Sequence, residues 1–482
     1  MAKFNEKSQG TKTLNRAGGQ AYKQTPELEM VSILLTSFAN DQFYRTANQT
    51  FDVLKDLIKR CNKKFVAQSA IYARTQFGMR SITHVTASEL AKYIGGEEWA
   101  RDFYEKVIHR VDDMTEILSY HTAHNGKVSN AMKEGLARAF AKFDAYQLAK
   151  YKGEGKGFKL VDVVNITHPL SVAEVWVKEE TKQAIEALIK GELKSTDTWE
   201  SKLTKAGQNA KDEDEKLELK KEAWTELINS RKLGYFALLR NLRNILTQAP
   251  NAVDKALEML TDERLIKKSL VMPFRYLTAI QEMKLVNNSR KVLQALNKAI
   301  NISLANVPTF EGKTLIALDL SGSMDGKPIE IGSVFASALY KSNDADLLVF
   351  GNDAQYKMPN PDDSLLTIAS ELIANLGGTN FHSIFERANR KYDRVIILSD
   401  MQGWMYSGWG SKPIASSYNK WKQVTGSDPY IYSFDLQGYG DMQFPERNVF
   451  CIAGFSDKVF DIMKLLETDK QALVNEIKRV EL

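Results

Sequence analysis

The chain has 482 residues, 43% of them hydrophobic and 26% charged, with a net charge of +5, which predicts a globular protein of two or three domains. Its two cysteines, Cys61 and Cys451, lie far apart in the sequence, which argues against a disulfide framework and favours a reducing compartment. The polar N-terminus has no signal peptide and no run approaches the roughly 18 apolar residues of a membrane span, so we expect a soluble, cytoplasmic protein with no membrane partner.

The chain begins with a polar segment, and a long helical part follows. Residues 1–24 are rich in Asn, Gln, Lys and Gly, which predicts a loose arm. From 25 to 305 apolar residues recur at spacings of three and four, and Thr25 followed by Pro26 is typical of a helix start. Many helices joined by short links predict a helical-repeat, HEAT-like solenoid.

The pattern changes after residue 310. Continuous apolar runs of strand length, such as "TLIALDL" (314–320) and "DRVIILSD" (393–400), alternate with amphipathic helical segments. Buried strands that alternate with helices are typical of a doubly wound, mainly parallel sheet. Residues 311–482 are therefore predicted to form one α/β domain.

Hard oxygen donors follow the strands of this domain. Asp319 and Asp400 each end an apolar run, and in a doubly wound sheet ligands bind at the carboxyl ends of the strands. Hydroxyls are expected on the same rim from Ser321, Ser323 and Thr379. Two carboxylates and three hydroxyls suit Mg²⁺ or another divalent cation. Each motif taken singly is also consistent with a turn or a helix cap.

Together these five residues resemble the metal-ion-dependent adhesion site of von Willebrand factor A domains. The resemblance covers residues 311–482, and it implies a metal with one open position that an acidic group of a protein partner fills. It therefore implies recognition and no catalysis. A phosphatase of the haloacid dehalogenase type would need a second carboxylate two residues after Asp319 as general acid, and Ser321 stands there. We therefore expect that this protein is not an enzyme.

The charge is unevenly divided between the two parts. Residues 1–310 carry 48 Lys and Arg against 37 Asp and Glu, a net +11, whereas residues 311–482 carry 17 against 23, a net −6. A basic part beside an acidic part predicts a polyanionic partner for the first and a cation for the second. Ordinary variation of solvated surfaces is the alternative.

Cations interleaved with aromatic rings give the RNA-binding candidates. RNA bound without sequence readout needs positive charge for its phosphates and rings for stacking. Tyr146, Tyr151 and Phe158 lie among the first lysines. The alternative is that these basic residues form a solvated cationic face or bind buried carbonyls. For His168 the alternative is a structural role at the end of a helix. The candidates are Arg138, Lys142, Lys150, Lys152, Lys156, Lys159, His168, Arg240 and Arg243.

Five motifs of the helical part resemble the TROVE module of Ro-type RNA-binding proteins, in a prokaryotic or phage-like form. They are "AGGQAYKQTPELE", "FDAYQLAKYKGEGKGF", "LVDVVNITHP", "ALLRNL" and "VMPF". The resemblance implies helical repeats bent into a ring that the A domain closes. It also implies binding of small structured (Y-type) RNA on the outer surface and of single-stranded ends of misfolded RNA in the hole.

The function that we expect is a non-catalytic RNA scaffold or chaperone in a ribonucleoprotein that serves RNA quality control. A metal-dependent protein-interaction scaffold without RNA binding is the alternative from a different class.

Overall fold

The computed structural model describes most of the chain. The described residues are 12–14, 20–23, 26–36, 47–153, 157–172, 177–194, 199–208, 210–287, 289–403, 414–436, 441–442, 449–453, 463 and 472–482. They divide into two compact units, one built around Lys23–Thr196 together with Ile452–Leu482 and one built around Asp197–Leu436. None of the described helices is long and apolar enough to cross a membrane.

The expected arm at 1–24 lies mostly outside the described residues. Its described parts are two short strands, β1 (Lys12–Leu14) and β2 (Gln20–Lys23), which pair antiparallel. These strands differ from the loose arm that composition predicts, because backbone pairing supplies order that the polar side chains do not.

The unit built around Lys23–Thr196 is helical. Apolar stripes at helical spacing pack against one another in its interior, with residues such as Leu57, Phe103 and Leu136 fully buried. Its α-helices are α1 (Pro26–Thr36), α2 (Ala47–Arg60), α3 (Lys63–Thr75), α4 (Ser81–Leu90), α5 (Ala100–Lys106), α6 (Val111–His124), α7 (Asn130–Ala139), α8 (Ala145–Lys150), α9 (Leu160–Thr167), α10 (Pro169–Val172), α11 (Glu179–Ile189) and α25 (Ala472–Lys478), and η1 (Phe140–Lys142) is a 3₁₀ turn.

A buried ion network joins α3, α4 and α6. The guanidinium of Arg74 donates to both carboxylate oxygens of Asp113 at 3.0 Å, and His84 Nε2 lies 2.9 Å from Asp113 Oδ1. The backbone N–H groups of His109 and Arg110 donate to Oδ2 of the same carboxylate. Burial by itself would raise the pKa of Asp113, but the hydrogen bonds from His84 and Arg74 outweigh it and hold this pKa well below the usual range.

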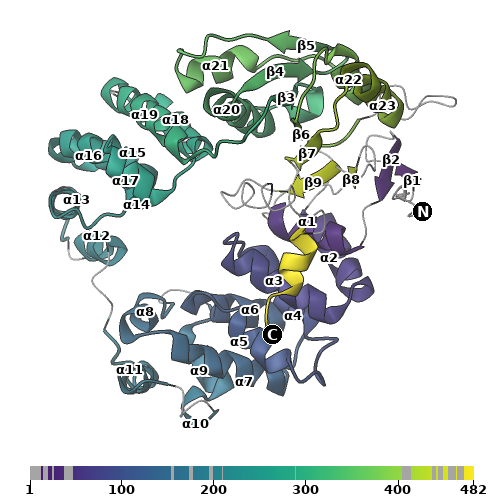
Figure 1. The fold of residues 1–482 in the computed structure, drawn as a ribbon. Coiled ribbons are helices and arrows are strands. Elements are labelled where there is room, and N and C mark those ends of the chain that lie inside the picture. Colours follow the sequence, from purple (N-terminus) through teal and green to yellow (C-terminus); the bar gives the residue numbers. More distant parts are fainter. Residues whose placement is uncertain are drawn as a thin grey trace. The chain divides into compact units, whose positions relative to one another are not determined.

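The C-terminal helix packs on the N-terminal helices of the same unit. Figure 1 shows α25, in yellow, beside α3. Ile477 is fully buried, and the side chain of Gln68 donates to the carbonyls of Lys478 and Val480 at 2.8 and 2.9 Å. Residues 472–482 thus pack into the unit that contains Lys23–Thr196.

The second unit begins with further helices. They are α12 (Trp199–Gln208), α13 (Glu213–Asn229), α14 (Tyr235–Arg240), α15 (Leu242–Gln248), η2 (Pro250–Ala252), α16 (Val253–Leu260), α17 (Glu263–Ser269), η3 (Pro273–Tyr276), α18 (Leu277–Lys284), α19 (Arg290–Ile302) and η4 (Ser303–Asn306). The change from helices to sheet at 306–310 falls inside this unit, because α19 packs against α21 and the N–H of Leu365 donates to Asn301 Oδ1 at 3.0 Å. The domain boundaries drawn from the sequence, and the ring, stay predictions.

A six-stranded mixed sheet follows, in the order β5-β4-β3-β6-β7-β9. Strands β4, β3, β6 and β7 are parallel, and β5 is antiparallel to β4. The strands are β3 (Thr314–Asp319), β4 (Ala345–Phe350), β5 (Ala354–Lys357), β6 (Arg394–Ser399), β7 (Tyr430–Asp435) and β9 (Val449–Ala453), and β8 (Asp441–Met442) lies outside this sheet. The expected change from helices to a mostly parallel α/β domain is confirmed.

Helices cover both faces of the central strands. The α-helices are α20 (Lys327–Ser342), α21 (Leu365–Leu372), α22 (Phe381–Arg387) and α23 (Ile414–Thr425), and η5 (Gly322–Met324) is a 3₁₀ turn. Figure 1 shows α20 and α21 on one side of β3 and β4, with α22 and α23 on the other. Because both faces are buried, every residue of β3 and β6 is buried, which explains their continuous apolar runs.

The order of the strands defines the place for a site. From β3 the chain crosses to β4 on one side and later to β6 on the other. The crevice at the carboxyl ends of β3 and β6 is therefore the switch point at which doubly wound sheets bind ligands.

Replacing Asp113 with Asn should destabilise the first unit by about 3–5 kcal/mol, because it leaves the buried charge of Arg74 without its counter-ion. Hydrogen exchange of α3, α4 and α6 amides in the full chain measures this loss, with the exposed Glu97→Gln as control. The contribution of Asp113 should be full at neutral pH and decline as the pH falls below about 4, where an unfolded aspartate takes up its proton. Equal protection in the two variants would contradict this role.

Candidate functional site

The first loop of the candidate metal site follows β3. Asp319, at the end of the strand, is fully buried. Its Oδ1 accepts the N–H of Ser321 at 2.8 Å, and its Oδ2 accepts the hydroxyl of Ser399 at 2.5 Å. The hydroxyls of Ser321 and Ser323 lie 3.3 Å apart. The Asp-x-Ser-x-Ser motif thus gathers its three oxygen donors in one buried loop.

The second loop lies directly beside the first. Gly322 N–H donates to the carbonyl of Gly377, and Leu376 N–H donates to the carbonyl of Leu320, both at 2.9 Å. Gly377 has φ +83°, and a Cβ there would lie 2.6 Å from the Asn352 side chain, so this turn strongly favours glycine. The bonds bring the segment that ends in the buried Thr379 next to the two serines.

Asp400 follows β6 and is also fully buried. Its Oδ1 accepts the N–H of Gln402 at 3.1 Å, whereas its Oδ2 has no hydrogen-bond partner among the described residues. A buried carboxylate oxygen without a partner is costly unless a ligand satisfies it.

Both buried carboxylates have a raised affinity for protons. Burial raises the pKa of Asp319 to about 6. Burial and then the charge of Asp319 raise the pKa of Asp400 to about 8, although a hydrogen bond from the Ser323 side chain opposes the rise. Repulsion of this kind is relieved by a proton or by a cation bound between the groups.

Sequence reasoning missed two residues of this site. Ser399 binds Asp319 from the neighbouring strand, and the charge of the buried Asp435, at the end of β7, raises the pKa of Asp400 further. The signal for both was present, because "LSD" and "SFD" end adjacent apolar runs.

The donors fit a small hard cation. The described residues contain no group of three or more His, Cys, Asp or Glu side chains that could hold a metal. The candidate site instead combines two carboxylates with three hydroxyls, and the partnerless Oδ2 of Asp400 is one atom that an ion would satisfy. Mg²⁺ takes one or two carboxylates and keeps several waters, so this donor set is chemically suitable. Magnesium itself stays a prediction.

The first two RNA-binding candidates, Arg138 and Lys142, form contacts within the protein. Arg138 forms ion pairs with Asp102 at 3.1 Å and with Glu134 at 2.6 Å. Lys142 donates to the carbonyls of Glu105 and Ile108 at the end of α5, and burial lowers its pKa. These two side chains join neighbouring helices, as the alternative reading of the sequence allowed.

The lysine segment is mixed in its accessibility. Lys152 donates to the carbonyl of Leu193 at 2.9 Å, and the ammonium of Lys150 lies 5.5 Å from the ring of Tyr151. Lys159 precedes α9 with an exposed side chain, and the exposed His168 ends α9 in a left-handed conformation, φ 48°. Lys156 lies outside the described residues. The role of these residues in RNA binding stays a prediction.

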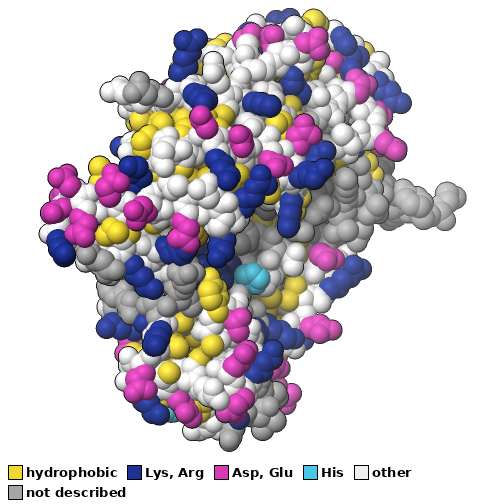
Figure 2. Space-filling view, turned by 90° about the vertical axis from the view of Figure 1, so that its left-hand side faces the viewer, with side chains coloured by type: hydrophobic (Ala, Val, Ile, Leu, Met, Phe, Trp, Pro, Cys, Tyr) yellow, Lys and Arg dark blue, Asp and Glu magenta, His cyan; other side chains and the backbone are white. Residues whose placement is uncertain are grey.

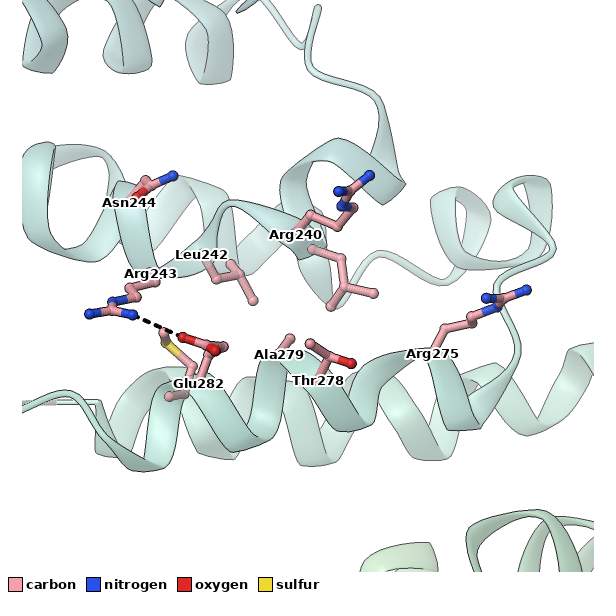
Figure 3. A pocket seen from close by; sticks show the side chains of 10 residues that line it. Arg240, Leu242, Arg243, Asn244, Arg275, Thr278, Ala279 and Glu282 are labelled. Atoms are coloured by element: carbon pink, nitrogen blue, oxygen red, sulfur yellow. Dashed lines mark hydrogen bonds and ion pairs between the residues drawn. The ribbon is translucent and has the colours of Figure 1, made fainter. Parts of the chain in front are cut away.

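The other candidates, Arg240 and Arg243, border a groove of about 210 Å³ between α14–α15 and η3–α18 (Figure 3). Both side chains are exposed, and Arg243 forms an ion pair with Glu282 at 3.0 Å. The sequence alone did not single out Arg275, which lines the same groove.

Figure 2 shows one face of the molecule, on which Lys and Arg side chains are interspersed with Asp and Glu. This face of the molecule is therefore not a surface of one sign.

Comparison with known proteins identifies the helical part. The sequence matches the TROVE domain over residues 32–223 and 188–307, which is more than half of the chain. The chain belongs to the TROVE domain family. The resemblance inferred from the five motifs is confirmed, and this TROVE protein continues beyond the matched region into the α/β domain.

Similar proteins include the mouse and rat forms of "Telomerase protein component 1". The identities are 23% over 290 residues and 22% over 297 residues, 45% of this chain in each case. The matched part spans only 11% of each of these relatives.

Among solved structures, the crystal structure of the Deinococcus radiodurans RO (RSR) protein is similar to this TROVE protein. The TM-score is 0.63 at 17% identity, and the superposition covers 95% of this chain and 100% of that one. At this identity the likeness concerns the fold, and it extends over both the helices and the α/β domain.

We expect Mg²⁺ to bind the wild-type protein and Asp319→Ala to abolish this binding, because the remaining hydroxyls cannot replace the lost carboxylate. Isothermal titration calorimetry checks this, with the exposed Asp362→Ala as the control. RNA affinity, measured in parallel, should be equal in the two variants. Equal magnesium affinity in wild type and Asp319→Ala would contradict the site.

The stability of the metal-free protein should fall as the pH rises from about 4 to about 8. Both aspartates have raised pKa values in the folded state, against about 3.9 in an unfolded chain, so their neutral forms stabilise the fold at low pH and this stabilisation is lost as they ionise. Thermal melting in EDTA measures the fall, and added Mg²⁺ should reduce it. An Asp400→Asn variant with an unchanged pH profile would refute this explanation.

Proposed function

We propose that this TROVE protein is a non-catalytic RNA-binding scaffold or chaperone of a ribonucleoprotein. The TROVE match over residues 32–307 carries the proposal, because proteins of this family are RNA-binding components of ribonucleoproteins. Its ligands in this proposal are small structured RNA of the Y type and single-stranded ends of misfolded RNA.

Charge and exposure support the proposal. The first 310 residues carry a net charge of +11. After the internal pairs of Arg138 and Lys142 are set aside, Lys159 and Arg240 still present exposed cationic side chains, and His168 is an exposed hydrogen-bonding group beside them. Cations that face solvent are free to neutralise phosphates, which supplies most of the affinity in binding without sequence readout.

For the α/β domain we propose a Mg²⁺ site that binds a protein partner. Asp319, Ser321, Ser323, Thr379 and Asp400 would hold the ion. When bound, the ion supplies an open coordination position for an acidic side chain. The partnerless Oδ2 of Asp400 favours this role. It also favours the second candidate function, a metal-dependent protein-interaction scaffold that binds no RNA.

Copurification distinguishes the two functions. The purified protein should carry an excess of absorbance at 260 nm over 280 nm, and ribonuclease treatment should remove this excess. Protein that is free of nucleic acid and that binds no added RNA at low salt would support the second candidate instead.

A variant with four lysines replaced by glutamine tests the role of the lysine segment in RNA binding. The variant replaces Lys150, Lys152, Lys156 and Lys159. RNA affinity should fall, and the dependence of log K on log salt should flatten by about 0.7–0.9 for each phosphate that the variant no longer neutralises. Electrophoretic mobility shifts over a salt series measure both quantities. The matched control replaces four lysines in or beside the acidic helix α13, namely Lys211, Lys216, Lys220 and Lys221. An unchanged slope in the first variant would remove this segment from the RNA-binding surface.

A further inference from the structure

The groove between α14–α15 and η3–α18 combines positive charge with an apolar slot. The slot is the middle of the groove, between Leu242 and Ala279. Three arginines border it, and its lining is completed by small, apolar and polar side chains. The lining residues are Leu239, Arg240, Leu242, Arg243, Asn244, Arg275, Thr278, Ala279, Glu282 and Met283. They all belong to the compact unit built around Asp197–Leu436, so this groove is complete within one packing unit.

The charges of the groove are not balanced. One of its three arginines, Arg243, is paired with Glu282, and Figure 3 shows this pair crossing from one helix to the other at one end of the groove. Arg240 and Arg275 lie toward the other end, and neither forms an ion pair with a described residue. Arg275 instead lies over the ring of Phe274, 5.2 Å from its centre. An excess of two guanidinium groups thus faces solvent beside the slot.

The middle of the groove has a different chemistry. In Figure 3, Leu242 faces Ala279 across the slot, and Thr278 lies beside Ala279 on the same helix. The small side chain of Ala279 leaves the slot open, and the exposed hydroxyl of Thr278 can donate or accept a hydrogen bond. At about 210 Å³ the whole groove is smaller than the roughly 300–1,000 Å³ typical of pockets for whole small molecules. It suits one flat part of a longer ligand.

We propose that this groove, here called the Arg240–Arg275 groove, binds one unit of single-stranded RNA. The inference rests on the proposed RNA-binding function and extends it to a specific place. Guanidinium groups bind phosphates through paired N–H donors and stack on bases. An unpaired base enters the apolar slot, and the phosphates beside it bind Arg240 and Arg275. A base within a duplex cannot enter, so the groove prefers single strands.

The ion pair between Arg243 and Glu282 lowers the affinity of the groove for RNA in this arrangement. Both partners are more than 45% exposed, so the pair contributes little to stability. It nevertheless places a negative charge next to the slot and occupies a third guanidinium. Removing Glu282 should therefore strengthen RNA binding, whereas removing Arg240 or Arg275 should weaken it.

The charge test uses the full chain and a short fluorescein-labelled oligouridylate, with anisotropy measured over a salt series. Arg240→Gln and Arg275→Gln should each lower the affinity about 3- to 10-fold and flatten the salt slope by about 0.7. Glu282→Gln should raise the affinity and steepen the slope. Lys391→Gln, which changes charge at an exposed residue outside the groove, should leave both unchanged. Circular dichroism melting shows whether each variant is folded.

A second test changes the shape of the slot and leaves the charge of the groove unchanged. Ala279→Leu should lower the affinity about 5-fold or more at an unchanged salt slope, with Ala279→Ser as the matched control. An abasic strand of the same length should bind the wild type more weakly and be insensitive to Ala279→Leu. Duplex RNA should be insensitive to every groove variant.

Each contrary result has a distinct meaning. If wild type binds the oligouridylate but Arg240→Gln and Arg275→Gln bind equally well, the groove is wrong while the proposed function stands. If wild type binds no RNA, both fail. If poly-glutamate binds with the same dependence on Arg240, Arg275 and Ala279, the groove is a docking site for acidic protein segments and not for RNA.

Discussion

The carboxylates of Asp319 and Asp400 lie buried at the carboxyl ends of adjacent parallel strands, and neither pairs with a cationic side chain among the described residues. Removing two like charges from water is unfavourable, so the loops around them are organised to reduce the cost. Ser321 and Ser399 donate to Asp319, and Gln402 donates to Asp400. One oxygen of Asp400 has no hydrogen-bond partner among the described residues, and this is the atom that would coordinate a bound cation.

The helical part uses its charges in the opposite way. One of its buried carboxylates, Asp113, is fully compensated by Arg74, His84 and backbone N–H groups, so it stabilises the packing of three helices and offers nothing to a ligand. Arg138, Lys142 and Lys152 likewise bind acceptors within the protein. A count of basic residues therefore exceeds the number of cations that solvent, or an RNA, can reach.

Most of the fold follows from local patterns. The apolar runs of β3 and β6 are continuous because both faces of these strands are covered, and the spacing of apolar residues in the helices matches their buried stripes. The positions of Asp319 and Asp400 could be inferred because a parallel sheet carries the ends of its strands to one edge. The small strands β1 and β2 were not expected, since their order comes from backbone pairing and not from a pattern of side chains.

The sequence by itself determined the order of the two architectures, the TROVE motifs, and the five oxygen donors of the candidate metal site. These depend on residue type and on spacing within one or two elements. Only the tertiary structure decided which groups meet. Ser399 reaches Asp319 across 80 residues, Gln68 holds a carbonyl 410 residues away, and Arg243 pairs with Glu282 across the groove that Arg275 also lines. The physical reason is that a side chain's availability to a ligand depends on its neighbours in space, and the packing of whole elements chooses those neighbours.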